Sequence, residues 1–425
     1  MKIHVVSAGE SIYLIARKYG VSPQKIITDN ELANPDQLVV GQTLVIIQST
    51  RRHTVAAGES LYSIARKYGV SLQAVLTANP QIPNPSQIVI GQVITIPGES
   101  QTYGTIEVNG YAFPNIAMET LRKTLPYLTY LSIFSHQVNS DGSVTNITDS
   151  QLIQAARAAR VAPLMVITNI QSGGSFNSDL ARSILRNPTV QNTLINNIIR
   201  ILREKNYYGL DIDFEYIYPA DRENYNNFLR RVVNTLRPLG YSVTTALAPK
   251  LSAEQKGVLY EAHDYPVHGA LADHVILMTY EWGYTYSPPK AVAPLNEVRK
   301  VLNYAVSAIP RQKIFMGIPN YGYDWTLPYV TGTAAKTISN TAAVDLARTK
   351  GTMIQYDATA QSPTLTYYEA GKKHEVWFED ARSIYAKLTL AHEFRLGGVS
   401  YWTIGRYFPQ NWLVLRSLYT IRKVL

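Results

Sequence analysis

Apolar and polar residues follow two different patterns along the chain, and the change comes near residue 103. Beyond it, short apolar segments alternate with stretches that place apolar residues at helical spacing, such as Val190–Lys205 and Arg222–Leu236. The segments that we predict to be strands are Thr105–Val108, Tyr130–Phe134, Leu164–Thr168, Gly209–Phe214, Ser242–Ala246, His274–Thr279, Lys313–Pro319 and Gly397–Tyr401. Such βα units, repeated over about three hundred residues, predict an α/β fold, the (β/α)8 (TIM) barrel, for residues 103–425.

One interval interrupts this alternation between the seventh and eighth predicted strands. Asp324–Phe378 is too long for an ordinary βα loop. It contains three further β-prone pieces, Met353–Asp357, Thr364–Tyr368 and His374–Phe378. We therefore predict a small α+β insertion on the C-terminal face of the barrel, where such loops build active sites.

The first part of the chain contains one pattern twice. Residues 4–22 read HVVSAGESIYLIARKYGVS, and residues 53–71 read HTVAAGESLYSIARKYGVS. Each copy predicts a short strand, a helix that Ser11 or Ser60 caps, a second helix, and a closing strand after a Gly-Gln pair. The order is β-α-α-β, which gives one small domain at residues 1–48 and another at 49–98, followed by a polar joint at 98–101.

These landmarks, G-E-S, I-A-x-x-Y and N-P…G-Q, resemble those of the LysM domain, and the resemblance covers Met1–Pro97. It implies binding of glycans that contain N-acetylglucosamine, such as peptidoglycan or chitin, between the first and last loops of each copy. The residues that it places there are Gly9, Glu10, Ser11 and Asn34 in the first copy and Gly58, Glu59, Ser60 and Asn84 in the second. The alternative is that they only maintain the fold, which we favour for the glycines.

Composition excludes several kinds of chemistry. The chain has no cysteine, which excludes disulfides, thiolate nucleophiles and cysteine-bound metals. Its net charge of +9 would suit an anionic partner, but the basic residues are dispersed, so we expect no nucleic acid. Nucleotide-binding glycine motifs are missing, and no apolar run is long enough to span a bilayer. We also see no signal peptide at the N-terminus, and we expect no membrane partner.

Acidic residues alternate along the fourth predicted strand, YGLDIDFEY at residues 208–216. Because successive side chains of a strand point to opposite faces, Asp211, Asp213 and Glu215 share one face. Buried carboxylates cost free energy unless they are hydrogen-bonded, bind a metal or serve chemistry, and close ones cannot all ionise. One carboxyl group that stays protonated could act as a general acid. A metal site is the main alternative, but an EF-hand glycine and clustered histidines are missing, so we expect no metal.

This strand resembles the D-x-x-D-x-D-x-E signature of glycoside hydrolase family 18, the chitinase-like barrels. The last three acidic positions are filled, whereas Tyr208 occupies the first. Residues 278–281, Met-Thr-Tyr-Glu, resemble the family's M-x-Y-D at the sixth strand, with Glu281 in place of the aspartate. Trp402 follows the eighth strand where the family keeps a tryptophan beneath the sugar, although core packing is the simpler alternative for such a residue.

The resemblance implies retaining hydrolysis in which the acetamido oxygen of the substrate is the nucleophile, without a cofactor. Glu215 would be the acid and then the base, and Asp213 would orient the acetamido group. Tyr280 would donate a hydrogen bond to that group, and Asp211 would keep its neighbours in the required protonation states. The residues expected to bind substrate are Trp402, Glu281, Trp282, Tyr323 and Trp325.

Tandem LysM copies on such a barrel resemble more specifically the spore cortical-fragment-lytic enzymes of bacilli, which are N-acetylglucosaminidases. The segments that carry this likeness are ALAPK at 246–250, LMTYEWGY at 277–284, YGYDWTLPY at 321–329 and HEVWFEDARSI at 374–384. It implies cleavage of β-1,4 bonds after N-acetylglucosamine in spore peptidoglycan during germination, in the coat or cortex region, by a monomer. A chitinase-type endoglycosidase and a non-catalytic glycan-binding protein are the alternatives.

Overall fold

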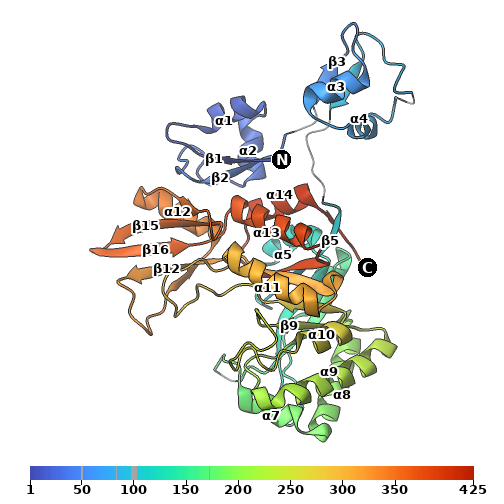
Figure 1. Cartoon of the computed structure of the whole chain (residues 1–425), viewed down its shortest axis with the longest axis vertical. Coiled ribbons are helices and arrows are strands. Elements are labelled where there is room, and N and C mark those ends of the chain that lie inside the picture. The colour runs from blue at the N-terminus through green and yellow to red at the C-terminus, as the bar shows by residue number, and fades with distance from the viewer. Residues whose placement is uncertain (49–50, 83, 97–102, 172) are drawn as a thin grey trace. The chain divides into compact units, whose positions relative to one another are not determined.

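The computed structural model describes the chain except for residues 49–50, 83, 97–102 and 172. The chain divides into two compact units, residues 1–104 with 409–419, and residues 105–408 with 420–425. Figure 1 shows the repeats of the first unit in blue and the second unit in cyan to red. The polar joint expected at 98–101 lies outside the described residues. The domain border expected at 48–49 falls where the described residues stop, at residue 48.

Each repeat of the first unit has the β-α-α-β order that the sequence predicts. Its two strands pair antiparallel into a small sheet. Ser11 and Ser60 cap the first helix of each repeat, and Gly20 and Gly69 end these helices with φ of 65° and 68°. The elements are β1 (Lys2–Val5), α1 (Ile12–Tyr19), α2 (Pro23–Asp29), β2 (Thr43–Ile46), β3 (Arg51–Thr54), α3 (Leu61–Tyr68), α4 (Leu72–Ala78) and β4 (Val93–Ile96).

Helix α14 (Pro409–Leu418) belongs to the same compact unit and contacts the first repeat. The Gln410 side chain donates to the Thr43 carbonyl at 2.6 Å and to Asn30 Oδ1 at 3.1 Å, and it accepts from the Thr43 hydroxyl at 2.9 Å. All three side chains are buried. Val93 stands in the place of Thr43 in the second repeat, so that repeat lacks the hydroxyl that Gln410 uses.

The second unit is built on parallel strands that close into a barrel. Each strand pairs in parallel with the next one along the chain, and the last pairs with the first. The barrel strands are β5 (Thr105–Ala112), β6 (Tyr130–Gln137), β7 (Ala162–Thr168), β8 (Gly209–Asp213), β9 (Ser242–Leu247), β10 (His274–Leu277), β11 (Ile314–Pro319) and β17 (Gly398–Trp402). All eight correspond to predicted segments, which confirms the barrel. A short strand, β18 (Thr420–Ile421), pairs with β5 on its other side.

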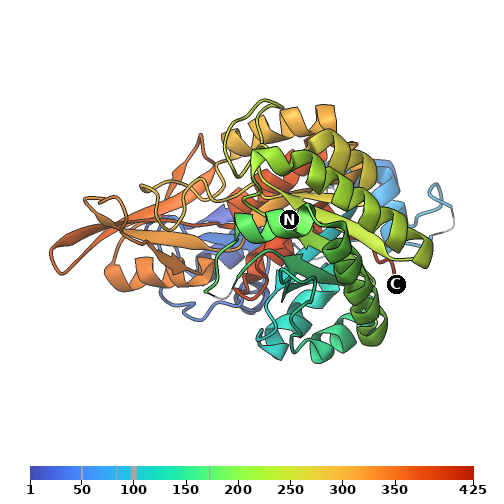
Figure 2. The ribbon, with the colours of Figure 1, turned by 90° about the horizontal axis from the view of Figure 1, so that it is seen from below.

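Helices lie outside this barrel, and the long α8 and α9, in green, flank the strands in both ribbon views (Figures 1 and 2). Phe214, just after β8, stacks on Tyr225 and Phe228 of α9, with ring centroids 6.1 and 5.9 Å apart. The residues between the carboxylates therefore face the outer apolar layer, as predicted. The helices are α5 (Met118–Thr124), α6 (Ser150–Ala158), α7 (Ser178–Leu185), α8 (Pro188–Lys205), α9 (Arg222–Leu236), α10 (Tyr265–Leu271), α11 (Leu295–Ala308) and α13 (Ala381–Glu393).

The interruption between the seventh and eighth barrel strands is an α+β insertion, as predicted. Its antiparallel sheet has five strands in the order β13-β12-β16-β15-β14. The sequence pattern identified three of these strands, but it missed the first two strands and the helix. The elements are β12 (Gly322–Leu327), β13 (Lys336–Ile338), α12 (Asn340–Lys350), β14 (Gln355–Asp357), β15 (Ser362–Glu369) and β16 (Lys372–Trp377).

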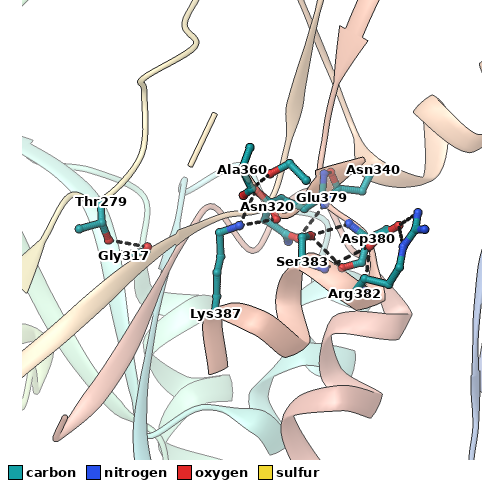
Figure 3. Close-up of polar contacts among 11 residues, drawn as sticks. Thr279, Gly317, Asn320, Asn340, Ala360, Glu379, Asp380, Arg382, Ser383 and Lys387 are labelled. Atoms are coloured by element: carbon teal, nitrogen blue, oxygen red, sulfur yellow. Dashed lines mark hydrogen bonds and ion pairs between the residues drawn. The ribbon is translucent and has the colours of Figure 1, made fainter. Parts of the chain in front are cut away.

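A buried ion pair connects α13 to the end of the insertion (Figure 3). Lys387 Nζ lies 2.8 and 3.0 Å from the two carboxylate oxygens of Glu379, and both side chains are 1% exposed. The Glu379 N–H donates to Asn340 Oδ1 of α12 at 2.9 Å. Burial raises the pKa of Glu379, and the Lys387 ammonium opposes this rise. Each of these two buried charges is therefore stabilised by the opposite charge of the other.

We expect Lys387→Met to lower the free energy of unfolding by about 3–5 kcal/mol, because it leaves the Glu379 carboxylate buried without a counter-charge. The double variant Glu379→Leu/Lys387→Met removes both charges and should recover most of that loss. Denaturant unfolding of both variants, followed by circular dichroism, measures the difference. If the single variant is as stable as the original protein, this ion pair does not have the role given to it.

Candidate active site

A cavity of about 420 Å³ lies where the barrel strands end at their carboxyl termini. In TIM barrels this end holds the active site. Its walls are largely aromatic, and among the described residues that line it the carboxyl groups are those of Asp213, Glu215 and Glu281. The other lining residues include Tyr111, Phe134, Tyr216, Tyr280, Tyr284 and Trp402. Such a lining combines flat apolar faces with hydrogen-bonding carboxyl groups, which suits an uncharged sugar.

Asp211 is fully buried inside the barrel. Its Oδ2 atom accepts hydrogen bonds from the Tyr111 hydroxyl at 2.7 Å and the Ser132 hydroxyl at 2.9 Å. Burial raises the pKa of Asp211 to about 6, and these two hydrogen bonds oppose the rise. Both donors come from strands far away in the sequence, β5 and β6, and the sequence analysis did not identify them.

Asp213 lies above Asp211 on the same strand face, nearer the cavity, and is 5% exposed. Within the described part of the chain, its Oδ1 atom and that of Asp211 are buried without a hydrogen-bond partner. Burial, followed by the negative charges of Glu215 and Asp211, raises the pKa of Asp213 well above its usual value. A proton bound to one of these two aspartates would reduce the repulsion between their negative charges and the cost of burying an oxygen without a hydrogen bond.

Glu215 lies two residues past the end of β8, on the cavity wall. Burial, and then the negative charge of Glu281, raises the pKa of Glu215 to about 7. A carboxyl group of this kind holds its proton near neutral pH and loses it as the pH rises through 7. The structure thus brings together the three predicted carboxylates, and a pKa near 7 is in the range that suits a general acid.

Aromatic side chains form one wall of the cavity around Trp402. The Trp402 ring makes edge contacts with Phe134 and Phe113, with centroids 4.8 and 5.7 Å apart. The Trp402 carbonyl accepts from the Asn320 N–H at 2.9 Å, and the Asn320 side chain donates to the Arg406 carbonyl at 2.7 Å. Figure 3 shows Asn320 beside Asn340 and Glu379, so the buried polar cluster of the insertion continues to the segment that holds Trp402.

The predicted substrate-binding residues near the insertion fall into different surroundings. Tyr323 and Tyr321 both donate to the Glu281 carboxylate, Tyr323 at 3.1 and 3.2 Å. Trp325 is 2% exposed, and its indole N–H donates to the Ser287 carbonyl at 2.7 Å, so its ring lies in the core. Trp282 is not among the residues that line the cavity, and its backbone N–H donates to the Val292 carbonyl at 3.0 Å. Tyr280 and Glu281 line the cavity directly.

Tyr208, which replaces the first acidic residue of the motif, packs among aromatic rings at the opposite end of the barrel. Its ring lies 6.2 Å from Tyr130, which in turn lies 5.1 Å from His274 and 6.1 Å from Phe315. The polar atoms of this cluster face Glu107, whose carboxylate accepts from the Tyr130 hydroxyl and lies 3.2 Å from His274 Nε2. The inner carboxylate of the motif is therefore absent, and Tyr111 and Ser132 are the groups that contact Asp211 instead.

In both repeats the loop predicted to bind glycan forms hydrogen bonds to other residues of the same repeat. The Glu10 carboxylate lies 2.8 Å from His4 Nε2 and accepts from the Ser7 N–H at 2.8 Å. Glu59 repeats this arrangement with His53 and Ala56. Gly9 and Gly58 have φ of 80° and 82°, which a glycine adopts most easily. Ser11 and Ser60 are helix caps, and the Asn34 carbonyl and Asn84 side chain accept hydrogen bonds within their turns.

Among the residues that the structure describes, no group of three or more acidic or histidine side chains is arranged to hold a metal ion. None of the helices in that part of the chain combines the length and apolar character needed to cross a bilayer.

Comparison with known proteins agrees with this geometry. The family model of glycosyl hydrolases family 18 matches residues 105–406, and the LysM domain model matches residues 4–46 and 53–97. The chain is 45% identical to the cortical fragment-lytic enzyme of Bacillus subtilis, over 100% of this chain and 99% of the relative.

Two solved structures are also similar over nearly the whole chain. The spore cortex-lytic enzyme SleL of Bacillus megaterium has a TM-score of 0.88 at 42% identity, covering 100% of this chain and 99% of that one. SleL of Bacillus cereus has a TM-score of 0.85 at 41% identity, covering 99% and 98%. The chain is therefore a glycoside hydrolase that belongs to glycosyl hydrolases family 18 and carries two LysM domains before its barrel.

Proposed function

We propose that the protein is an N-acetylglucosaminidase that cleaves β-1,4 bonds after N-acetylglucosamine in fragments of spore cortex peptidoglycan during germination. The observation that carries this proposal is the position of Glu215 and Asp213 on one cavity lined by aromatic rings, where burial raises the pKa of Glu215 to about 7. Relatives that are similar over the whole chain are named cortical fragment-lytic enzymes, which supports the substrate. The same names support a location in the coat or cortex region of the spore.

In the proposed mechanism, Glu215 protonates the glycosidic oxygen of the leaving sugar and then removes a proton from the incoming water. Its raised pKa suits both steps, because a carboxyl group that titrates near neutral pH can donate and accept. The nucleophile is the acetamido oxygen of the sugar being cleaved, which attacks its own anomeric carbon. The anomeric configuration is therefore retained without a covalent bond to the protein.

Asp213 orients the acetamido N–H and stabilises the positive charge of the cyclic intermediate, and Tyr280 donates to the acetamido oxygen. Both line the cavity beside Glu215. Asp211 is fixed by Tyr111 and Ser132, and its negative charge helps Asp213 to retain a proton. Trp402 supports the apolar face of the sugar.

The reaction should depend on Glu215 and leave N-acetylglucosamine at the new reducing ends. Glu215→Gln keeps the shape of the side chain and removes its proton, so we expect a loss of at least roughly 10²-fold in kcat. Digestion of purified cortex fragments, followed by borohydride reduction and mass spectrometry, identifies the reduced sugar. Release of reducing-end muramic acid, or near-original rates in the variant, would exclude this function for the site.

We also propose that the two LysM repeats hold the enzyme on its polymer. Two linked weak sites raise apparent affinity through effective concentration, by on the order of 10²-fold. The double variant Asn34→Ala/Asn84→Ala should therefore bind insoluble peptidoglycan more weakly than either single variant, while its rate on short soluble fragments stays unchanged. Sedimentation with insoluble peptidoglycan measures binding. Equal retention of the original and doubly substituted proteins would argue against these residues as ligands.

A further inference from the structure

The backbone that carries Glu215 is held by side chains and not by neighbouring strands. The ladder between β8 and its neighbours ends at Asp213, two residues earlier. Beyond it, the carbonyls of residues 214, 215 and 216 each accept a hydrogen bond from a side chain. The donors are His263, in the connection between β9 and α10, Asn169, just after β7, and Ser178, the first residue of α7. A strand end that would otherwise be free to move is thus fixed at each successive peptide.

Asn169 pairs with the Glu215 peptide in both directions. Its Oδ1 atom accepts from the Glu215 N–H at 2.9 Å, and its Nδ2 atom donates to the Glu215 carbonyl at 2.9 Å. The second Nδ2 hydrogen goes to the Asn177 carbonyl at 3.0 Å. Asn169 is fully buried, and both ends of its amide are used, so its orientation is fixed.

His263 holds the preceding peptide as a neutral imidazole. Its Nδ1 atom lies 2.8 Å from the Ala248 N–H, which can only donate, so Nδ1 carries no proton. Its Nε2 atom therefore carries the proton and donates to the Phe214 carbonyl at 3.0 Å. Burial lowers the pKa of His263 to about 4, so this form persists at neutral pH. The ring joins the ends of β8 and β9.

The carboxyl group of Glu215 itself has no hydrogen-bond partner within the described part of the chain, and nothing there fixes its direction except packing and the backbone that carries it. The next residue, Tyr216, has a φ of 54°, in the left-handed region that a tyrosine rarely adopts. Surrounding contacts must therefore hold this backbone in place. We propose that Asn169 and His263 are positioning residues, which act together as a clamp that aims Glu215 at the scissile bond.

This proposal rests on the assignment of Glu215 as the acid, and it predicts a specific kinetic effect. Asn169→Ala and His263→Ala should each lower kcat by on the order of 10- to 100-fold, because a displacement of about 1 Å can cost 10²-fold. The KM should change by less than about 3-fold, since neither side chain lines the cavity. His263→Gln retains an N–H near the position of Nε2 and should recover part of the loss.

A matched control separates positioning from stability. His268 is equally buried and hydrogen-bonds to Thr245 at 3.1 Å, but within the described part of the chain it makes no hydrogen bond to residues 214–216. His268→Ala should therefore lower the melting temperature about as much as His263→Ala and leave kcat within about 2-fold of the original.

The pH profile gives a second readout. In the original protein the alkaline limb of kcat reports the proton on Glu215, which Asp213, Glu281 and Tyr280 surround. A displaced Glu215 is less buried, so its pKa falls and the limb moves to lower pH in Asn169→Ala and His263→Ala. Equal losses of kcat in His263→Ala and His268→Ala, or an unmoved limb in both clamp variants, would overturn the clamp. Full activity of Glu215→Gln would instead overturn the proposed function.

Discussion

The burial of three carboxyl groups in one barrel is the constraint on which the rest of the site depends. Taking carboxylates out of water is costly, so each must gain a hydrogen bond, a proton or a route to solvent. Asp211 gains two hydroxyl donors, burial and the nearby charges of Glu215 and Asp211 raise the pKa of Asp213, and Glu215 reaches the cavity. The same burial that costs stability raises the pKa of Glu215 to about 7 and so prepares it for acid chemistry.

The row of carboxyl groups in this barrel is shorter than in the motif that its sequence resembles, because Tyr208 occupies the first acidic position. Where that motif has a further acidic residue, the uncharged Tyr208 packs against Tyr130. Asp211 is therefore the innermost of the three carboxyl groups on this strand face, and Tyr111 and Ser132 donate hydrogen bonds to it. A carboxylate remains at this end of the barrel, that of Glu107, which lies 3.2 Å from His274 Nε2.

Local patterns allowed the barrel strands, the repeats and the orientation of the carboxylates to be predicted, because strand alternation and helix caps depend on residues close in sequence. Partners distant in the chain could not be predicted. Tyr111 lies 100 residues from Asp211, and Asn169 lies 46 residues from Glu215. The sequence also cannot distinguish an aromatic ring that lines a groove, such as Trp402, from one that fills the core, such as Trp325.

Direct titration of Glu215 tests the central claim, that burial and the charge of Glu281 keep its proton near neutral pH. Carbon-13 NMR of protein labelled at the glutamate carboxyl carbons follows each group through the pH range. We predict a resonance with a midpoint near pH 7 that is absent from Glu215→Gln and moves to lower pH in Glu281→Gln. A Glu215 resonance that titrates near 4.3, the ordinary glutamate value, would contradict the account.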